Sequence, residues 1–241
     1  MPSFVVVIPT KNEEEYLPRL IESLKKQTLQ PNEVVLADAG STDQTTQIAE
    51  AAGMRAVEGG LPGPGRNAGA QATKSDLIFF IDADIVLPDP QFFAKAIADF
   101  EKRQLGVGTF DLQLVKGSWV EHLGHKIYNA YVRFWGGWNA HAMGGCILVR
   151  RSVHEAINGF DPTVLFCEDN HYGKRAHKIM PFGVINGVKI GVTNRRLARD
   201  GGLTIVVKYL LAELHIIFLG PIRTNWFKYE FGYKKGMGKG E

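Results

Sequence analysis

The first half of the chain alternates short apolar runs with longer segments that are apolar along one side only. The runs Phe4–Ile8, Glu33–Ala37 and Leu77–Ile81 are rich in aliphatic or aromatic residues, which is typical of strands buried in a parallel sheet. The segments that follow these runs have apolar residues at helical spacing, and we expect helices over Glu14–Gln27, from an N-cap at Ser41 to Ala52, and after Asp89-Pro90. This alternation predicts βαβ units and therefore an α/β fold with a mostly parallel central sheet flanked by helices.

The second half of the chain is less regular. Its pattern predicts a helix around Trp119–Tyr131, a strand over Cys146–Val149, and a helix that Ser152 and Glu155 open as a capping box and that Gly159 ends. The glycine-rich run over residues 59–65 has neither the G-x-G-x-x-G pattern nor the G-K-[ST] ending of a phosphate-binding loop. We expect an ordinary loop there.

Composition narrows the class of protein. The chain has 241 residues, of which 45% are hydrophobic and 22% charged, so a globular domain with a sizeable core is expected. A net charge of +3 is too small to suggest a dedicated nucleic-acid-binding protein. The two cysteines, Cys146 and Cys167, lack zinc-type spacing, and the N-terminus lacks the features of a secretory signal, so we expect a reducing, cytoplasmic compartment.

Ligands of a parallel sheet bind at the carboxyl ends of its strands, so chemistry is expected just after Ile8, Ala37 and Ile81. The five residues after Ile8, PTKNE, contain no glycine, which counts against a dinucleotide site. Asp38 follows the second run and could accept a hydrogen bond from a ribose hydroxyl or a base N–H. The segment Asp38–Asp43 could equally form only a turn and a helix cap.

The third strand is followed by two carboxylates, Asp82 and Asp84, which are costly to place together unless a cation or hydrogen-bond donors neutralise them. A divalent ion that also binds phosphate oxygens is the natural partner. A second acidic pair, Glu168-Asp169, follows another apolar stretch. By itself this pair could consist only of acidic residues favoured at a helix N-terminus by the helix dipole.

Taken in order, five segments resemble the inverting family 2 glycosyltransferases with the GT-A fold, over roughly residues 3–200: Val7–Glu13, Asp38–Asp43, Arg66–Gly69, Phe80–Asp84 and Glu168-Asp169. The resemblance implies the GT-A fold of nucleotide-diphospho-sugar transferases, a nucleotide-diphosphate sugar as donor, and Mg²⁺ or Mn²⁺ as cofactor. Ala39 stands where many members of the family have a second carboxylate, so the base of the donor, in UDP or GDP, stays open.

The same resemblance assigns roles to single residues. It implies that Asp169 is the general base, that Asp84 and Asp82 hold the metal, and that the nucleotide sugar contacts Pro9, Thr10, Glu13, Asp38, Arg66, Asp82 and Ala83. Trp135 and Trp138 could form a stacking wall for the acceptor, beside Glu168, or could be ordinary core aromatics.

The C-terminal segment carries all of the net positive charge, with six basic and three acidic residues from Leu203 to Glu241. Its apolar run, Leu203–Gly220, is interrupted by charged residues and is followed by aromatic residues and lysines. Such a segment suits an anionic membrane surface, although a helix packed on the domain or in a dimer would look the same. We expect a GT-A domain over residues 1–202 and a basic, aromatic-rich extension over residues 203–241.

The leading hypothesis is a metal-dependent inverting glycosyltransferase at the cytoplasmic face of the membrane, with a lipid-linked or glycan acceptor and no nucleic-acid partner. One alternative is a sugar nucleotidyltransferase, but this class usually carries a glycine-rich phosphate loop after its first strand. The other is a catalytically silent GT-A-like binding module, which would be expected to lack one of Asp82, Asp84 and Asp169, and all three are present.

Overall fold

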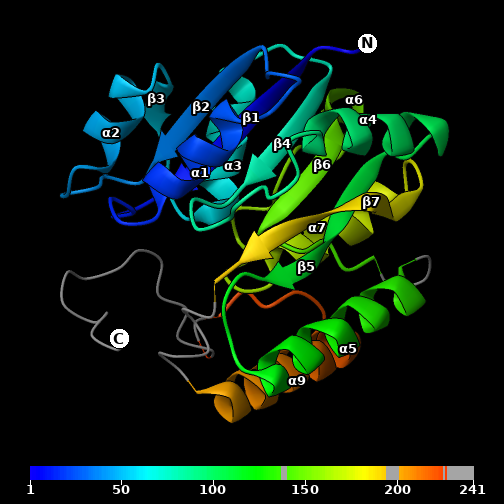
Figure 1. The fold of residues 1–241 in the computed structure, drawn as a ribbon. Helices are drawn as coiled ribbons and strands as arrows, with labels where there is room; N and C mark the ends of the chain where they lie inside the picture. The colour runs from blue at the N-terminus through cyan, green and yellow to red at the C-terminus, as the bar shows by residue number, and fades with distance from the viewer. Residues whose placement is uncertain (137–139, 194–200, 225, 227–241) are drawn as a thin grey trace.

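The computed structural model describes residues 1–136, 140–193, 201–224 and 226, and its centre is a mixed sheet (Figure 1). Across the sheet the strands are ordered β3-β2-β1-β4-β6-β5-β7. Their bounds are β1 Phe4–Thr10, β2 Glu33–Asp38, β3 Arg55–Glu58, β4 Leu77–Ile81, β5 Val107–Leu114, β6 Cys146–Arg150 and β7 Phe182–Val192. All neighbouring pairs are parallel except those of β6, which runs antiparallel to β4 and β5. The predicted mostly parallel α/β fold is confirmed.

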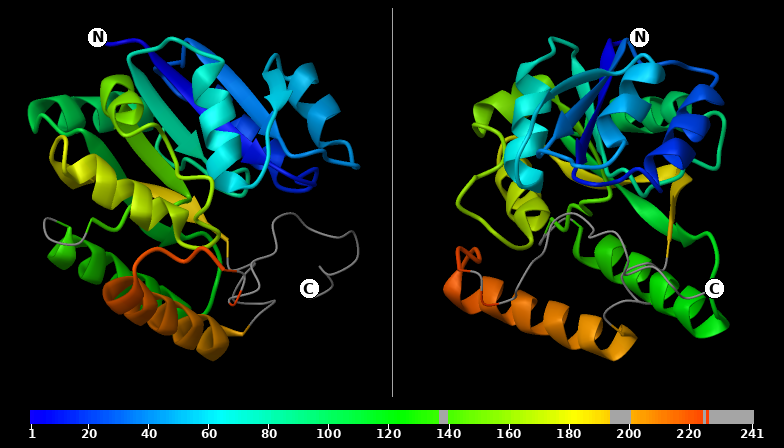
Figure 2. Two further views of the ribbon diagram at one scale, coloured as in Figure 1. Left: turned by 180° about the vertical axis from the view of Figure 1, so that it is seen from behind. Right: turned by 90° about the vertical axis from the view of Figure 1, so that its left-hand side faces the viewer.

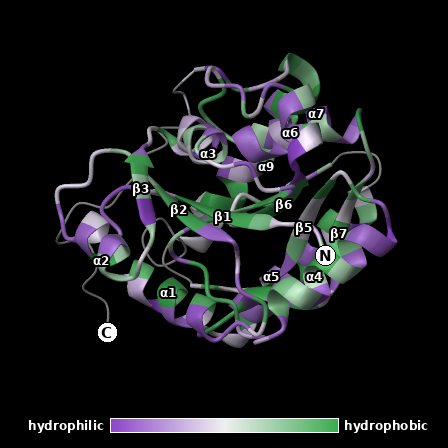
Figure 3. Ribbon diagram, turned by 90° about the horizontal axis from the view of Figure 1, so that it is seen from above, coloured by the Kyte–Doolittle hydropathy of each residue, from purple (hydrophilic) through white to green (hydrophobic). Residues whose placement is uncertain are grey.

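Helices cover both faces of the sheet (Figures 2 and 3). Their bounds are α1 Leu17–Lys25, α2 Thr45–Ala51, α3 Pro62–Gln71, α4 Phe92–Lys102, α5 Trp119–Trp135, α6 Arg151–Ala156, α7 Glu168–His177 and α9 Gly202–Leu219. Alternate residues of β1 point to opposite faces, as the period of a strand requires. Val6 packs with α1 and α4 in one buried cluster, whereas Val7 packs with α3, α6 and α7 in another.

Three of the predicted helix starts are wrong. The capping box expected at Ser152 does not form, because α6 begins at Arg151 and has no side-chain cap; a capping box forms instead between Ser118 and Glu121 at the start of α5. Ser41 lies outside α2, and its hydroxyl donates to Asp38 at 2.5 Å. Asp89 accepts from the Gln91 N–H at 2.8 Å, ahead of a helix that starts at Phe92.

The glycine-rich run is helical in its second half, because α3 begins at Pro62. Proline suits the first helical position, since its missing N–H would have no partner inside the helix there. The expectation of an ordinary loop is therefore correct only for the residues before α3. Arg66 lies within this helix, and its buried side chain forms an ion pair with Asp82, the residue that follows β4.

The C-terminal helix α9 lies with α5 beyond the carboxyl end of β5 (Figure 1). Ala212 and Ile222 are buried against Phe166 and Cys167, which directly precede α7. No helix within the described residues is long and apolar enough to span a bilayer. The predicted division at residue 202 stays a prediction.

Candidate active site

The carboxyl ends of β1 and β2 bring the first two candidate segments together. The register of these strands pairs Thr10 with Asp38, and the Thr10 hydroxyl donates to Asp38 Oδ1 at 3.1 Å. The N–H of Ser41 donates to the other carboxylate oxygen, Oδ2, at 2.8 Å. Thr10 is fully buried, so the carboxylate of Asp38 is fixed by groups that cannot move readily.

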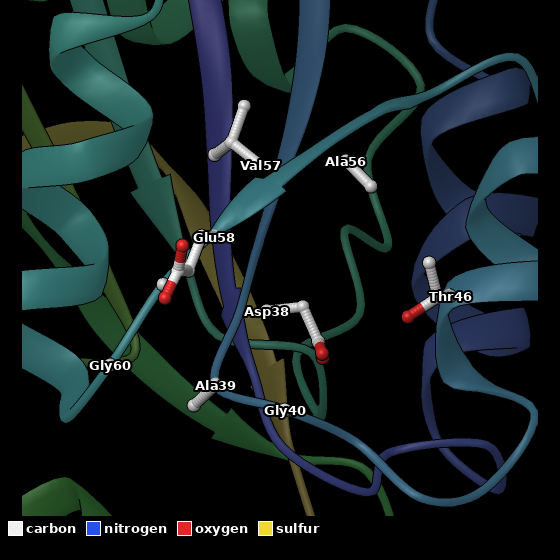
Figure 4. A pocket seen from close by; sticks show the side chains of 9 residues that line it. Asp38, Ala39, Gly40, Thr46, Ala56, Val57, Glu58 and Gly60 are labelled. Carbon is white, nitrogen blue, oxygen red and sulfur yellow. The ribbon is translucent and has the colours of Figure 1, made fainter.

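Asp38 lines an open pocket of about 540 Å³ between β2, β3 and α2 (Figure 4). The pocket also contains the side chains of Thr46, Val57 and Glu58, together with Gly40, Gly59 and Gly60. A Cβ at Gly59 would lie 2.6 Å from the backbone of Ala37, so only glycine allows this close approach. A carboxylate and a hydroxyl beside a glycine-walled cavity can take the polar edge of a small planar ligand.

Pro9 and Glu13 are buried near this pocket but do not line it. Pro9 pairs with Ala37 inside the sheet, and the backbone N–H of Glu13 donates to the hydroxyl of Thr45 at 2.8 Å. Ala83 is also buried, with its methyl group in the core, so only its backbone is available to a ligand. Contacts of these residues with a nucleotide sugar stay predictions.

Arg66 joins the third and fifth candidate segments. Its side chain is 2% exposed and forms ion pairs of 2.8 Å with both Asp82 and Glu168. The guanidinium also donates to the carbonyl of Gly144 at 3.1 Å and lies over the ring of Phe160. Burial alone would lower the pKa of Arg66, but the nearby carboxylates outweigh burial and raise that pKa, so the group stays charged. Arg66 thus holds together segments that are far apart in the sequence.

Asp169 lies in the first turn of α7 and remains partly accessible to solvent. Its Oδ2 accepts the N–H of Gly144 at 2.7 Å, and its Oδ1 accepts the N–H of Asn170 at 2.8 Å. Burial, followed by the neighbouring charge of Glu168, raises the pKa of Asp169 to about 6, whereas Arg66 and the two N–H groups act in the opposite direction. A carboxylate with a pKa in this range is suited to accept a proton near neutral pH.

The residues after β4 fit a divalent cation that is shared with a ligand. Asp82 and Asp84 are two residues apart and partly accessible, and one oxygen of Asp82 is already bound by Arg66. Within the described residues, no group of three or more acidic, histidine or cysteine side chains is arranged to hold a metal by itself. Mg²⁺ commonly takes one or two protein carboxylates and completes its shell with phosphate and water, so this pair is sufficient.

The candidate acceptor residues have different positions. Glu168 is brought to the site by its ion pair with Arg66, and its side chain is 13% exposed. Trp135 is partly exposed at the end of α5, beside the ring of Phe134, so it is not a core aromatic. Trp138 lies outside the described residues.

Sequence reasoning missed two residues of the site, Tyr128 of α5 and Gly144. Burial, followed by the charge of Asp169, raises the pKa of the Tyr128 phenol, so the candidate base and this hydroxyl influence each other's ionisation. A Cβ at Gly144 would lie 2.8 Å from Asp169 Oδ2, so this glycine lets the backbone reach the carboxylate. The Gly144-Gly145 pair before a strand was the available signal for Gly144, whereas Tyr128 has none in the sequence.

The site combines an open pocket beside Asp38, a carboxylate pair that suits a metal–phosphate ligand, and a separate carboxylate with a raised pKa. This arrangement is typical of α/β enzymes that bind a phosphorylated ligand at the carboxyl edge of the sheet. Residues 5–157 match the family described as Glycosyl transferase family 2. The chain belongs to this family, and the expected resemblance is confirmed.

Two curated relatives illustrate the family. The chain is 25% identical over 206 residues to the 4,4'-diaponeurosporenoate glycosyltransferase of Staphylococcus haemolyticus, covering 80% of this chain and 52% of that protein. It is 31% identical over 174 residues to the undecaprenyl-phosphate 4-deoxy-4-formamido-L-arabinose transferase of Serratia proteamaculans, covering 63% of this chain and 50% of that protein. The chain therefore spans about half the length of these relatives.

Solved structures show the same fold. Residues 1–349 of TarS from S. aureus, in complex with UDP-GlcNAc, superpose with a TM-score of 0.66 at 22% identity, covering 93% of this chain and 75% of that chain. The mannosyltransferase PcManGT from Pyrobaculum calidifontis, in complex with GDP-Man and Mn²⁺, gives a TM-score of 0.68 at 18% identity, covering 88% of this chain and 61% of that chain. The GT-A fold is confirmed.

Proposed function

We propose that the protein is a metal-dependent, inverting glycosyltransferase that transfers a sugar from a nucleotide-diphosphate sugar to a lipid-linked or glycan acceptor at the cytoplasmic face of a membrane. The observation that carries the proposal is the position of Asp169. Its carboxylate has a raised pKa and is joined through Glu168 and Arg66 to Asp82, beside Asp84. The ion pairs of Arg66 thus support a site in which Asp169, as the proton acceptor, lies near a carboxylate pair that would bind the diphosphate through a metal ion.

The proposed reaction is a single in-line displacement. Asp169 takes the proton of the acceptor hydroxyl, whose oxygen attacks the anomeric carbon from the face opposite the diphosphate. The bond from that carbon to the diphosphate oxygen breaks as the new glycosidic bond forms, so the configuration inverts. Mg²⁺ or Mn²⁺ bound to Asp82 and Asp84 would offset the charge that grows on the leaving diphosphate.

The donor is proposed to place its base or ribose in the pocket at Asp38 and its diphosphate at Asp84. Asp38 ends β2 and Asp84 follows β4, and β1 lies between these two strands in the sheet, so both residues are at the same edge. The complexes of TarS with UDP-GlcNAc and of PcManGT with GDP-Man and Mn²⁺ support a nucleotide sugar and a divalent metal as the ligands. They also leave both UDP and GDP as candidates.

A lipid-linked acceptor is supported by the relative that is named an undecaprenyl-phosphate transferase and by the exposed apolar residues of α9. Membership of the glycosyltransferase family argues against the alternative of a sugar nucleotidyltransferase. The presence of Asp82, Asp84 and Asp169 in one site argues against a catalytically silent module.

The test begins with thermal unfolding of the purified protein with UDP, GDP, UDP-GlcNAc and GDP-mannose, each with and without Mn²⁺. A ligand that binds only the native state raises the apparent Tm. The stabilising donor is then incubated with a lipid-linked or free glycan that carries an acceptor hydroxyl, and the anomeric configuration of the product is read by NMR. Asp169→Asn serves as the control, because it should bind the donor and transfer about 10²- to 10⁴-fold more slowly.

Two results would contradict the proposal. Retention of the donor's anomeric configuration in the product would exclude a single displacement. If none of the four nucleotides raises the Tm, with or without Mn²⁺, the proposed donor site is wrong and a catalytically silent module is favoured.

A further inference from the structure

The helices α5 and α9 expose far more apolar surface than is usual for a folded domain. On α5 the exposed fractions reach 75% for Trp119, 62% for Ile127 and 80% for Phe134, and on α9 they reach 60% for Leu210 and 78% for Phe218. The other exposed apolar residues of the two helices are Val120, Leu123, Trp135, Val206, Val207, Tyr209, Leu211, Leu214, Ile217 and Leu219. So many large apolar side chains exposed on two neighbouring helices mark an interaction site, unlike single exposed apolar residues, which are common on ordinary surfaces.

The two helices belong to one structural unit, because they meet across His141. The ring of Tyr131, on α5, packs edge-on against the ring of His141 with centroids 5.3 Å apart. On the other side, His141 Nε2 lies 3.0 Å from a carboxylate oxygen of Glu213, on α9. Both helices lie beyond the same edge of the sheet, at a similar level (Figures 1 and 2).

This pair of helices is also directly connected to the candidate base. Ala212 of α9 and the following Ile222 are buried against Phe166 and Cys167, which immediately precede Glu168 and Asp169. The loop that contains His141 continues to Gly144, whose N–H donates to Asp169. A partner that docks on α5 and α9 is therefore held close to Asp169, the candidate base.

The positive charge near the apolar residues favours an anionic partner. Lys116 precedes α5 and Lys126 lies on it, and both are exposed, whereas the ammonium of Lys208 on α9 faces the buried ring of Phe166, 5.1 Å from its centroid. The sequence after α9 adds Lys228, Lys234, Lys235 and Lys239. In a dimer formed through this surface Lys116 and Lys126 of the two copies would repel each other, which opposes self-association.

We propose that α5 and α9 form one docking surface for an anionic lipid bilayer, with both helices lying along the headgroup region. The surface consists of the exposed apolar residues of the two helices, with Trp119 at one end of α5 and Trp226 after α9, both more than 70% exposed. Tryptophan rings and lysines favour the headgroup level, while the aliphatic side chains enter the acyl boundary. The inference rests on the proposed function, since docking would present a lipid-linked hydroxyl to Asp169.

Paired serine substitutions on each helix test the proposal with the full-length chain. One variant carries Trp119→Ser and Ile127→Ser on α5, and the other carries Leu210→Ser and Phe218→Ser on α9. Ile179→Ser is the control, because Ile179 is 52% exposed but lies on neither helix. All five positions are exposed, so folding should be retained, which circular dichroism checks.

The assay is co-sedimentation with vesicles of phosphatidylglycerol and phosphatidylcholine, compared with phosphatidylcholine alone. The unsubstituted chain and the Ile179→Ser control should bind the anionic vesicles. Each double variant should bind at least about tenfold more weakly, because several apolar groups no longer enter the bilayer. Binding should also weaken in about 1 M salt, where the Debye length falls to about 3 Å.

Three results would overturn the inference. The first is an α5 variant that binds as the unsubstituted chain does, which would exclude α5 from the surface. The second is equal binding to both kinds of vesicle at all salt concentrations. The third is a chain that stays in the supernatant but sediments in the ultracentrifuge as a dimer that either double variant abolishes, because a second copy would then be the occupant.

Failure of this inference can be told apart from failure of the proposed function. Vesicle binding is measured without a donor, and the Mn²⁺-dependent rise in Tm with UDP or GDP is measured without vesicles. A chain that shows the nucleotide effect but no vesicle binding retains the proposed chemistry and loses the docking surface. The reverse result retains the surface and removes the nucleotide site.

Discussion

Replacing Gly144 by alanine should impair the candidate base while leaving the donor site intact. The added Cβ would lie 2.8 Å from Asp169 Oδ2 and 3.5 Å from a guanidinium nitrogen of Arg66, so the carboxylate has to move. The backbone of Gly144 does not require glycine by itself, since its φ is not in the left-handed region. The effect would therefore come from the contact with Asp169 and not from backbone strain.

The expected loss of transfer rate can be estimated from the hydrogen bond between the Gly144 N–H and Asp169, which the substitution would displace. A bond from an N–H to a charged group contributes about 1.5–3 kcal/mol. If this positioning is lost, the rate of transfer should fall about ten- to a hundredfold. The affinity for the donor nucleotide should change little, because the pocket at Asp38 is lined by other residues.

The pH dependence provides a second, more specific measurement. The N–H of Gly144 lowers the pKa of Asp169, which burial and Glu168 otherwise raise to about 6. Losing this bond should raise the pKa further, and the base acts only when it is deprotonated. The acidic limb of the kcat profile should therefore move to higher pH in Gly144→Ala.

Gly145→Ala is the matched control, because its Cβ would lie 3.1 Å from the end of the Ile85 side chain and not against Asp169. Its profile should keep the position of the acidic limb. An unchanged kcat and an unchanged acidic limb in Gly144→Ala would refute the assignment of Asp169 as the base held by Gly144.

Three further outcomes follow from the same geometry. Asp84→Ala should remove the Mn²⁺-dependent part of UDP or GDP binding in calorimetry, and equal affinity in the variant would exclude Asp84 as a metal ligand. Arg66→Met should lower the free energy of unfolding in urea by about 3–5 kcal/mol, because it leaves Asp82 and Glu168 without their buried partner; a loss below about 1 kcal/mol would contradict this role. Asp169 binds a proton more readily in the folded than in the unfolded state, so its contribution to stability falls as pH rises from about 4 through about 6. Asp169→Asn should remove this pH dependence and should be more stable than the unsubstituted chain at neutral pH. If the free energies of unfolding from urea titrations of the two proteins differ by the same amount on both sides of about pH 6, the raised pKa of Asp169 is contradicted.

The local sequence was sufficient to predict a strand where a continuous apolar run dominated the segment. β1, β2 and β4 were predictable because continuous apolar runs are stable only in the middle of a sheet. Three strands carry no such pattern and were missed: the four-residue β3, β5, and β7, which contains Gly183, Gly187 and Gly191. Helix starts were misplaced because serine and aspartate form turns as readily as caps, and here Ser41 and Asp89 take part in local turns, Ser41 with Asp38 and Asp89 with the N–H of Gln91.

The sequence by itself determined which acidic residues are candidates for the site and which apolar runs precede them, because both can be recognised from neighbouring residues alone. The tertiary structure decided how they are connected. β6 runs antiparallel beside β4, which sets Gly144 against Asp169, and α3 turns Arg66 inward between Asp82 and Glu168. The pairing of α5 with α9 was equally invisible in the sequence, since contacts between distant segments depend on the packing of the whole chain and not on local periodicity.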